Sequence, residues 1–335
     1  MSSTVSLTEY FQAVERHLIR SGKMPAAYFR VRICGELIEL RFPTEELAKV
    51  GKSSLSGFLT QEEGPVDAAF FYWYDFCDDY LPAGQSEYSS VWRSNDQTGS
   101  LMIGTDRNLL AGQDYVRKRF YWAQPEPQEE SQLSCRHIMV NAFAFWAKYS
   151  EKLLVHAAAV GYQQTGVLVV GRGGRGKSTF AISCLTEGLD FVSDDYTLLT
   201  ASGELEAMPL YSCVGLRTDM WEKLPKLGEP TVWIQGKPLF NISGSRFCSR
   251  MPIKAVILPL AEGDAEPSIY PVSRGQAMAQ LIDSTVTQLE SRQDAVLIRK
   301  LSQRLAGLPV YEMRMSCDLQ KNPAFLRSFI EKELL

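Results

Sequence analysis

The stretch that most constrains this chain is 171–178, which reads Gly-Arg-Gly-Gly-Arg-Gly-Lys-Ser. It matches G-x-x-x-x-G-K-[ST], a pattern in which consecutive backbone N–H groups and a helix N-terminus face a phosphate. Four glycines let the backbone approach an anion without a Cβ in the way. In this motif Lys177 reaches the β- and γ-phosphates and the Ser178 hydroxyl binds Mg²⁺. The pattern predicts an ATP and Mg²⁺ site whose nucleotide-binding residues are Gly171, Gly173, Gly174, Arg175, Gly176, Lys177, Ser178 and Thr179.

The residues on either side of this loop have the pattern that such a site requires. Upstream, 166–170 is an unbroken apolar, β-branched run that is typical of a strand buried on both faces. Downstream, 178–187 has helical spacing of apolar residues, and Gly188 stands where a helix C-cap is expected. The order strand, loop, helix favours a phosphate-binding loop over a glycine-rich turn with a stray lysine.

Charge and composition limit the partners of the chain. At 335 residues it is long enough for two domains, and 45% hydrophobic and 22% charged residues are ordinary for a globular protein. A net charge of −4 argues against nucleic acid or an anionic membrane as a partner, because both favour a basic surface. No apolar run is long enough to span a bilayer.

Two further features suggest the compartment. Seven cysteines are scattered without a C-x-x-C pair, which fits reduced thiols better than a disulfide framework or a zinc site. The N-terminus lacks the charged start and apolar core of a secretory signal. We therefore predict a cytoplasmic protein.

The pattern of elements predicts an α/β protein with two domains. Residues 1–124 form a smaller, mostly β region of mixed α+β type, which has aromatic strands but no chemical motif and is a candidate for acceptor recognition. Residues 125–131 are polar with two prolines and are the best linker candidate. Residues 132–335 form a mixed sheet flanked by helices around the loop. The main elements expected are helices at 8–21, 132–148, 275–283, 286–305 and 322–335, and strands at 27–42 with a break at Gly35, 68–76, 152–160, 254–260 and 308–314.

Adjacent carboxylates, Asp194 and Asp195, follow the predicted strand 191–193. In open α/β sheets ligands bind at the carboxyl ends of strands. A carboxylate at such a strand end reaches the metal directly or through water, and we assign this role to Asp194. The alternative is a solvated pair of turn residues.

Four elements at matched spacing resemble the catalytic core of HPr kinase/phosphorylase, a bacterial kinase of a serine in a phosphocarrier protein. They are His156, the loop 171–178, Asp194 and Asp195; His156 lies 21 residues before Lys177, and Asp194 lies 17 residues after it. The resemblance covers 150–200 well and the rest of the C-terminal region in outline. The chain also looks like the shorter HPr kinase-related proteins, some of which phosphorylate a serine of a lasso-peptide precursor.

The resemblance implies an HPr kinase-like C-terminal domain in which Asp195 is the general base and His156 contributes to catalysis. From the residues alone, the alternative to a site role for His156 is a buried, hydrogen-bonded core histidine. Arg250, with Arg246 as a substitute, is our candidate for stabilising charge on the transferred phosphoryl group, because a guanidinium matches phosphate oxygens. The chain departs from the family at Arg172 and Arg175 and lacks a clear match for the second acidic Mg²⁺ ligand.

These observations predict an ATP- and Mg²⁺-dependent kinase that transfers the γ-phosphate to a hydroxyl, that of a serine in a peptide or protein. A kinase of a small hydroxylated metabolite and a nucleotide-hydrolysing switch without a phosphorylated acceptor are the alternatives. The partners we expect are the serine-containing peptide or protein acceptor and, at most, further copies of this chain as a homo-oligomer. We expect neither nucleic acid nor a membrane.

Overall fold

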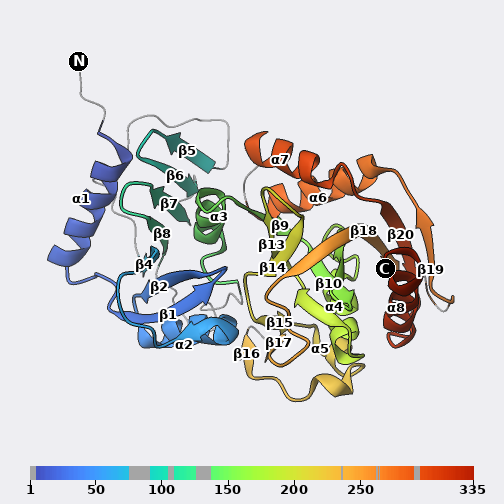
Figure 1. Cartoon of the computed structure of the whole chain (residues 1–335). Coiled ribbons are helices and arrows are strands. Elements are labelled where there is room, and N and C mark those ends of the chain that lie inside the picture. Colours follow the sequence, from blue (N-terminus) through green and yellow to red (C-terminus); the bar gives the residue numbers. More distant parts are fainter. Residues whose placement is uncertain are drawn as a thin grey trace. The chain divides into compact units, whose positions relative to one another are not determined.

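The computed structural model describes residues 5–74, 91–104, 109–125, 137–234, 237–261, 263, 265–289 and 295–335. The chain is a mixed α/β protein that divides into two compact units, 1–150 and 151–335 (Figure 1). The sequence places the linker at 125–131, most of which lies outside the described residues. The division falls later, because the helix Val140–Tyr149 packs on strands of the first unit instead of joining the second.

The first unit is built on one mixed sheet with the strand order β3-β1-β2-β4-β8-β7-β6-β5. The predicted break at Gly35 is the turn between β1 and β2, which pair antiparallel, whereas β4 runs parallel to both β2 and β8. Its elements are α1 (Leu7–Arg20), β1 (Ala27–Ile33), β2 (Glu36–Phe42), α2 (Glu45–Ser54), η1 (Ser56–Phe58), β3 (Leu59–Thr60), β4 (Ala68–Tyr74), β5 (Val91–Asn95), β6 (Gly99–Gly104), β7 (Leu110–Asp114), β8 (Arg119–Gln124) and α3 (Val140–Tyr149).

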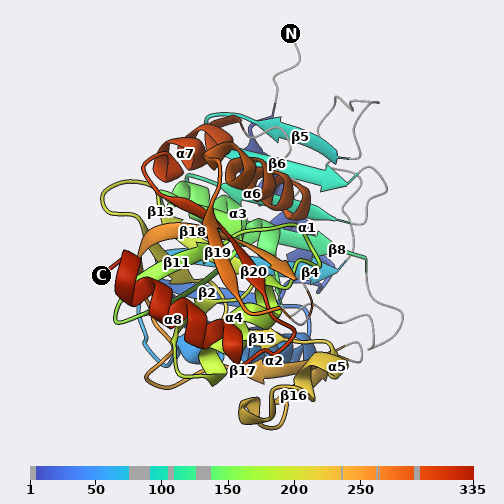
Figure 2. The ribbon, with the colours of Figure 1, turned by 90° about the vertical axis from the view of Figure 1, so that its right-hand side faces the viewer.

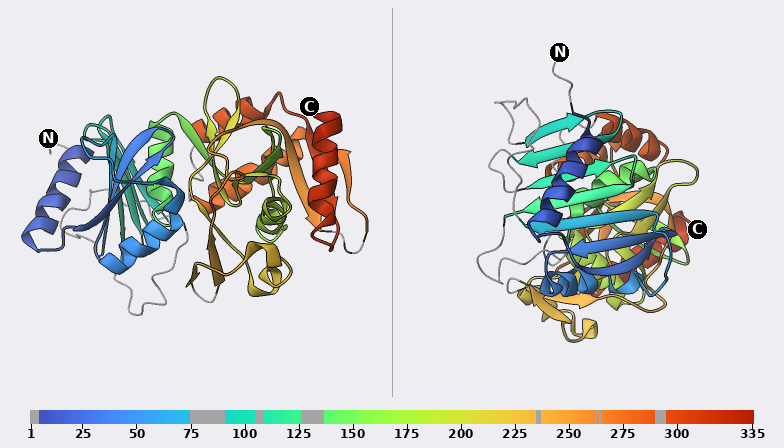
Figure 3. Two further views of the ribbon diagram at one scale, coloured as in Figure 1. Left: turned by 60° about the horizontal axis from the view of Figure 1, so that its bottom comes forward. Right: turned by 90° about the vertical axis from the view of Figure 1, so that its left-hand side faces the viewer.

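Aromatic residues alternate across the central strands of this sheet and fill both faces. Tyr121 of β8 stacks on Phe11 of α1 at 4.2 Å between ring centroids. On the opposite face, Phe70 of β4 lies 4.6 Å from Phe143 of α3. Figure 3 shows α1 on one side of the sheet and α2 and α3 on the other. The aromatic strand at 68–74 is therefore core, as aromatic-rich strands usually are.

The second unit contains the loop 171–178. Its larger sheet has the order β12-β10-β11-β18-β14-β13-β9, and β20 pairs with β18 and with β19; β15, β17 and β16 form a small separate sheet. Its elements are β9 (Lys152–His156), β10 (Ala158–Tyr162), β11 (Thr165–Val169), α4 (Lys177–Thr186), β12 (Asp190–Ser193), β13 (Tyr196–Thr200), β14 (Glu206–Pro209), β15 (Cys213–Gly215), α5 (Thr218–Trp221), η4 (Pro225–Leu227), β16 (Val232–Ile234), β17 (Lys237–Asn241), β18 (Met251–Ala261), β19 (Ser268–Pro271), α6 (Arg274–Gln288), α7 (Ala295–Leu305), β20 (Val310–Met315) and α8 (Lys321–Glu333).

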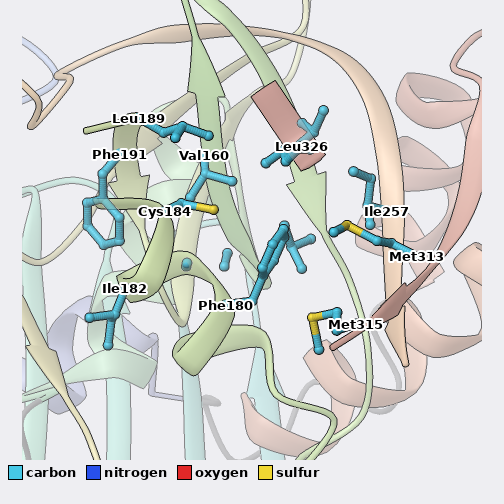
Figure 4. Close-up of a cluster of buried hydrophobic side chains, with 14 of the residues drawn as sticks. Val160, Phe180, Ile182, Cys184, Leu189, Phe191, Ile257, Met313, Met315 and Leu326 are labelled. Carbon is cyan, nitrogen blue, oxygen red and sulfur yellow. The ribbon is translucent and has the colours of Figure 1, made fainter. Parts of the chain in front are cut away.

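Strict alternation along β11 divides the core of this unit into two layers. Val167 and Val169 pack with α4 and α8, in a cluster where Phe180 lies among strand and helix side chains (Figure 4). Leu168 faces the other way, into a cluster with residues of α6 and α7. Figure 2 shows α8 and the α6–α7 pair on different sides of β18 and β20. A strand covered on both faces explains why 166–170 reads as a continuous apolar run.

Two expected elements differ from the structure. The predicted strand 152–160 is two strands, because the chain leaves β9 at Ala157 and pairs next with β11 through β10. The predicted break between the helices 275–283 and 286–305 falls elsewhere: α6 continues through 284–285 to Gln288, and α7 begins at Ala295. Within the described residues, no helix is long and apolar enough to cross a membrane. Cys184, Cys248 and Cys317 carry free thiols.

Candidate active site

Strand direction gathers the expected site residues at one edge of the larger sheet. Strand β10 runs antiparallel to β11, with Ala158 opposite Val169, and to β12, with Ala159 opposite Ser193. The carboxyl ends of β11 and β12 therefore lie on either side of the start of β10. Strand β18 runs parallel to β11, so its carboxyl end lies at the same edge. The loop 171–178 and the pair Asp194–Asp195 both leave the sheet here.

The loop itself has the backbone that an anion site needs. Gly174 and Gly176 have φ values of +81° and +87°, a region that costs other L-residues free energy. Gly176 is the N-cap of α4, and no side chain caps the helix there. The N–H groups of the first turn thus have no side-chain acceptor from the cap. Such a helix start favours an anion, because these N–H groups and the helix dipole point toward it.

Lys177 is buried, and its side chain folds back on the loop. Its Nζ donates to the carbonyl of Gly171 at 2.7 Å and lies 3.4 Å from the carbonyl of Arg172. Burial lowers the pKa of Lys177 from its ordinary value, and the nearby charges of Asp195 and Asp194 oppose that shift. The two carboxylates therefore do not fully offset the cost of burying the charged ammonium group. A phosphate at the loop would add negative charge beside it.

The two carboxylates have different surroundings. Asp194 is 3% exposed, and its backbone carbonyl accepts a hydrogen bond from the Ser178 hydroxyl at 3.3 Å. Asp195 is the more open of the two, and its Oδ1 lies 2.5 Å from Nε2 of His156. The expected adjacency of His156, Lys177 and the acidic pair is thus present in the structure.

His156 ends β9 and is held from the helix side. The residue is 6% exposed, and its ring centroid is 5.6 Å from that of Tyr196. The backbone N–H of His156 donates to Oγ1 of Thr285 at 3.1 Å, and the backbone carbonyl of His156 accepts from Oγ of Ser284 at 3.4 Å. Nδ1 of the ring is buried without a hydrogen-bond partner. A buried imidazole held on its backbone and on one nitrogen has a defined orientation toward Asp195.

The oxygen atoms at this edge suit a magnesium ion. Mg²⁺ is commonly held by one or two carboxylates together with water and substrate phosphates, and does not need an all-protein cage. The Ser178 side chain and the buried carboxylate Asp194 are brought together by the bond between Ser178 and the Asp194 backbone. Among the described residues, no group of three or more His, Cys, Asp or Glu side chains forms a metal cage. The donors present fit Mg²⁺ bound partly by the nucleotide.

Arg250 is not brought to this edge. It precedes β18, and the register of β18 with β11 places it seven residues before Ile257, the partner of Val169. At about 3.3 Å per residue, Arg250 is roughly 20 Å along the strand from the loop. Its Nη1 lies 3.2 Å from Glu206. Arg246, our alternative to Arg250, pairs with Asp190 at the start of β12. It therefore also lies away from the carboxyl ends of the strands.

Helix α6 supplies contacts that the sequence did not predict. Asp283 lies 3.0 Å from Nε of Arg172 in the loop, and the Gln280 side chain lies beside Gly171. Ser284 and Thr285 hold the His156 backbone. The sequence pattern predicts helices at 275–283 and 286–305, so it assigns Ser284 and Thr285 to neither helix.

Comparisons with known proteins add a weak structural neighbour. No family model matches the chain, and no curated protein matches it. Among solved structures, the chain is similar to the HPr(Ser) kinase/phosphatase from Coxiella burnetii, with 12% sequence identity and a TM-score of 0.29. The match covers 53% of this chain and 93% of that one. Similarity at this level leaves the function to be argued from the site.

Proposed function

We propose that this chain is a cytoplasmic ATP- and Mg²⁺-dependent kinase that transfers the γ-phosphate to a hydroxyl, that of a serine in a peptide or protein. The observation that carries the proposal is the 2.5 Å contact between His156 and Asp195, beside a lysine of a phosphate-binding loop. A nucleotide site alone needs no such carboxylate. A carboxylate oriented by an imidazole suits a general base for an acceptor hydroxyl.

In this proposal, the loop amides and Lys177 bind the phosphates of ATP. Ser178 and Asp194 would hold Mg²⁺, which neutralises phosphate charge when bound. Asp195 accepts the proton of the acceptor hydroxyl while the hydroxyl oxygen bonds to the γ-phosphorus. The bond from the γ-phosphorus to the bridging oxygen breaks, and ADP leaves. His156 holds the Asp195 carboxylate through Nε2 during this step, which the contact between the two side chains supports.

The test is transfer of label from γ-labelled ATP to an array of serine-containing peptides, each paired with its Ser→Ala counterpart. A kinase labels serine peptides and leaves the alanine counterparts unlabelled. Release of labelled phosphate with no labelled peptide would favour the nucleotide-hydrolysing switch. Label on a small hydroxylated compound alone would favour the metabolite kinase.

Recognition of the acceptor is proposed for the first unit. Within its described residues, exposed aromatic side chains remain at Tyr28 and Tyr149, which are 55% and 39% exposed. Aromatic rings give large contact area at a low entropic cost. Substituting each by alanine should raise the acceptor KM and leave the ATP affinity unchanged. An unchanged KM for both variants would contradict this role.

Arg250→Ala should change the transfer rate by less than about twofold, because surface substitutions away from a site usually have small effects. Arg250 is 59% exposed at its side chain and pairs with Glu206 beyond reach of the loop. Single-turnover transfer from γ-labelled ATP measures the effect. A tenfold loss with normal stability would return Arg250 to the site.

A further inference from the structure

Strand β9 lies at the end of its sheet order. The backbone N–H and C=O of His156 therefore need hydrogen-bond partners from outside the sheet. Among the described strands, β9 is the last in its order and pairs with β13 alone, where His156 lies opposite Tyr196. A buried N–H or C=O that has no strand partner costs free energy unless another group bonds to it. Both groups of His156 are bonded by hydroxyls of α6.

These hydroxyls come from buried, consecutive residues of the helix. Thr285 is fully buried and accepts from the His156 N–H at 3.1 Å, across 129 residues of sequence. Ser284 is 7% exposed, and its hydroxyl also lies 3.2 Å from the carbonyl of Leu281 in its own helix. The bond of Ser284 to His156 is longer, at 3.4 Å. Thr285 therefore makes the stronger of the two contacts.

The same helix also contacts the phosphate-binding loop. Asp283 pairs with Arg172, and Gln280 lies beside Gly171. Residues 280, 283 and 284 are spaced so that they share one helix face. One turn of α6 thus contacts the start of the loop and the end of β9 together.

We propose that Thr285 is a positioning residue for the His156–Asp195 pair. Its hydroxyl takes the place of a neighbouring strand as the partner of the His156 N–H. This hydrogen bond fixes the position of the His156 backbone, so that Nε2 contacts the Asp195 carboxylate. Thr285 does not touch the reacting atoms. The role in catalysis rests on the proposed function, whereas the effect on the imidazole does not.

The decisive variant is Thr285→Val in the full chain, which keeps the shape of the side chain and removes the hydroxyl. Thr285→Ser restores the hydroxyl and loses only a methyl group. Thr165→Val is a matched control, because Thr165 is also buried but starts β11 at the far end of the strand. A displacement of about 1 Å in a catalytic group can cost about 10²-fold in rate. We expect Thr285→Val to lower single-turnover transfer by about 10- to 100-fold on this basis, with ATP affinity unchanged.

A second measurement reads His156 directly. The chain has three histidines, so the imidazole region of a ¹⁵N NMR spectrum is simple, and His156→Gln identifies the His156 signals. In the wild type the Nε2–H bonded to Asp195 should exchange slowly with water. In Thr285→Val it should exchange at least about tenfold faster, because an unmet backbone N–H loosens the strand end. Thr285→Ser and Thr165→Val should keep both the slow exchange and the transfer rate.

An unchanged His156 signal in Thr285→Val would overturn the proposal, whether or not the rate falls, because a rate loss would then reflect general structure. Parallel losses of ATP affinity, thermal stability and rate in Thr285→Val and Thr165→Val would overturn it as well. If the wild type transfers no phosphate to any acceptor, the proposed function fails. The exchange measurement still decides whether Thr285 positions His156.

Discussion

Asp195→Asn lowers single-turnover phosphate transfer by about 10²- to 10⁴-fold, the usual contribution of a general base, while Mg²⁺–ATP still binds. Asparagine keeps the shape of the side chain and an oxygen that can face Nε2 of His156, which lies 2.5 Å from Asp195 in the wild type. It cannot accept a proton from the acceptor hydroxyl. Rapid-quench measurements with γ-labelled ATP give the rate, and nucleotide titrations give the affinity.

Asp194→Asn is the matched comparison for this variant. Asp194 is buried beside Ser178, and weakening a metal ligand should raise the Mg²⁺ concentration that transfer requires. Both variants are therefore titrated with Mg²⁺. Loss of Mg²⁺–ATP binding in Asp195→Asn, with binding retained in Asp194→Asn, would exchange the two roles. Full transfer in both variants would remove the acidic pair from the site.

Lys177→Met abolishes measurable phosphate transfer and weakens ATP binding by about 10- to 10²-fold, because a hydrogen-bonded contact to a charged group contributes about 1.5–3 kcal/mol and this lysine also supplies charge at the phosphates. Its Nζ already donates to the loop carbonyl of Gly171, which shows that the side chain reaches back over the loop. ATP titrations and single-turnover assays measure the two effects. Wild-type transfer in this variant would remove 171–178 from the active site.

Relative to the Lys177→Met protein, the wild type should gain thermal stability as the pH rises through the folded pKa of Lys177 toward 10.5. Burial lowers the pKa of Lys177 below its ordinary value of 10.5, so the unfolded chain holds this proton more tightly than the folded one. The charged lysine therefore opposes folding at neutral pH, and this penalty is lifted as the pH rises through the folded pKa toward 10.5. Thermal melts should show any advantage of the variant shrinking over that range. A wild type that loses stability relative to the variant over that pH range would contradict the sign.

The loop and its flanking elements could be predicted from the sequence because their signals are local. Glycines at 174 and 176 supply the positive φ values that the turn needs, and the next residues start a helix directly. The apolar run before the loop is buried on both faces, as β11 is. Gly188 has a φ of +81° just past α4, where a C-cap was expected. Each of these features depends on a few neighbouring residues.

Helix α6 shows why other parts of the site could not be predicted. The sequence pattern predicts helices at 275–283 and 286–305, with Ser284 and Thr285 between them. In the structure both residues lie near the C-terminal end of one uninterrupted helix, where they are buried and make two hydrogen bonds to His156, although hydroxyl residues are unfavourable inside helices. Tertiary contacts of this kind leave no periodic signal in the sequence.

By itself, then, the sequence determined the glycine-rich loop 171–178, the strands and helix that hold it, and the acidic pair at a strand end, since backbone conformation and periodic burial are encoded locally. The tertiary structure decided which distant residues join them. Strand register brings His156 to Asp195 and keeps Arg250 at the far end of β18. The edge position of β9 requires partners for the His156 backbone, and α6 provides them. Strand pairing and the packing of a helix over a sheet edge join residues that are far apart in the sequence. They depend on the free energy of the whole unit and not on local residues.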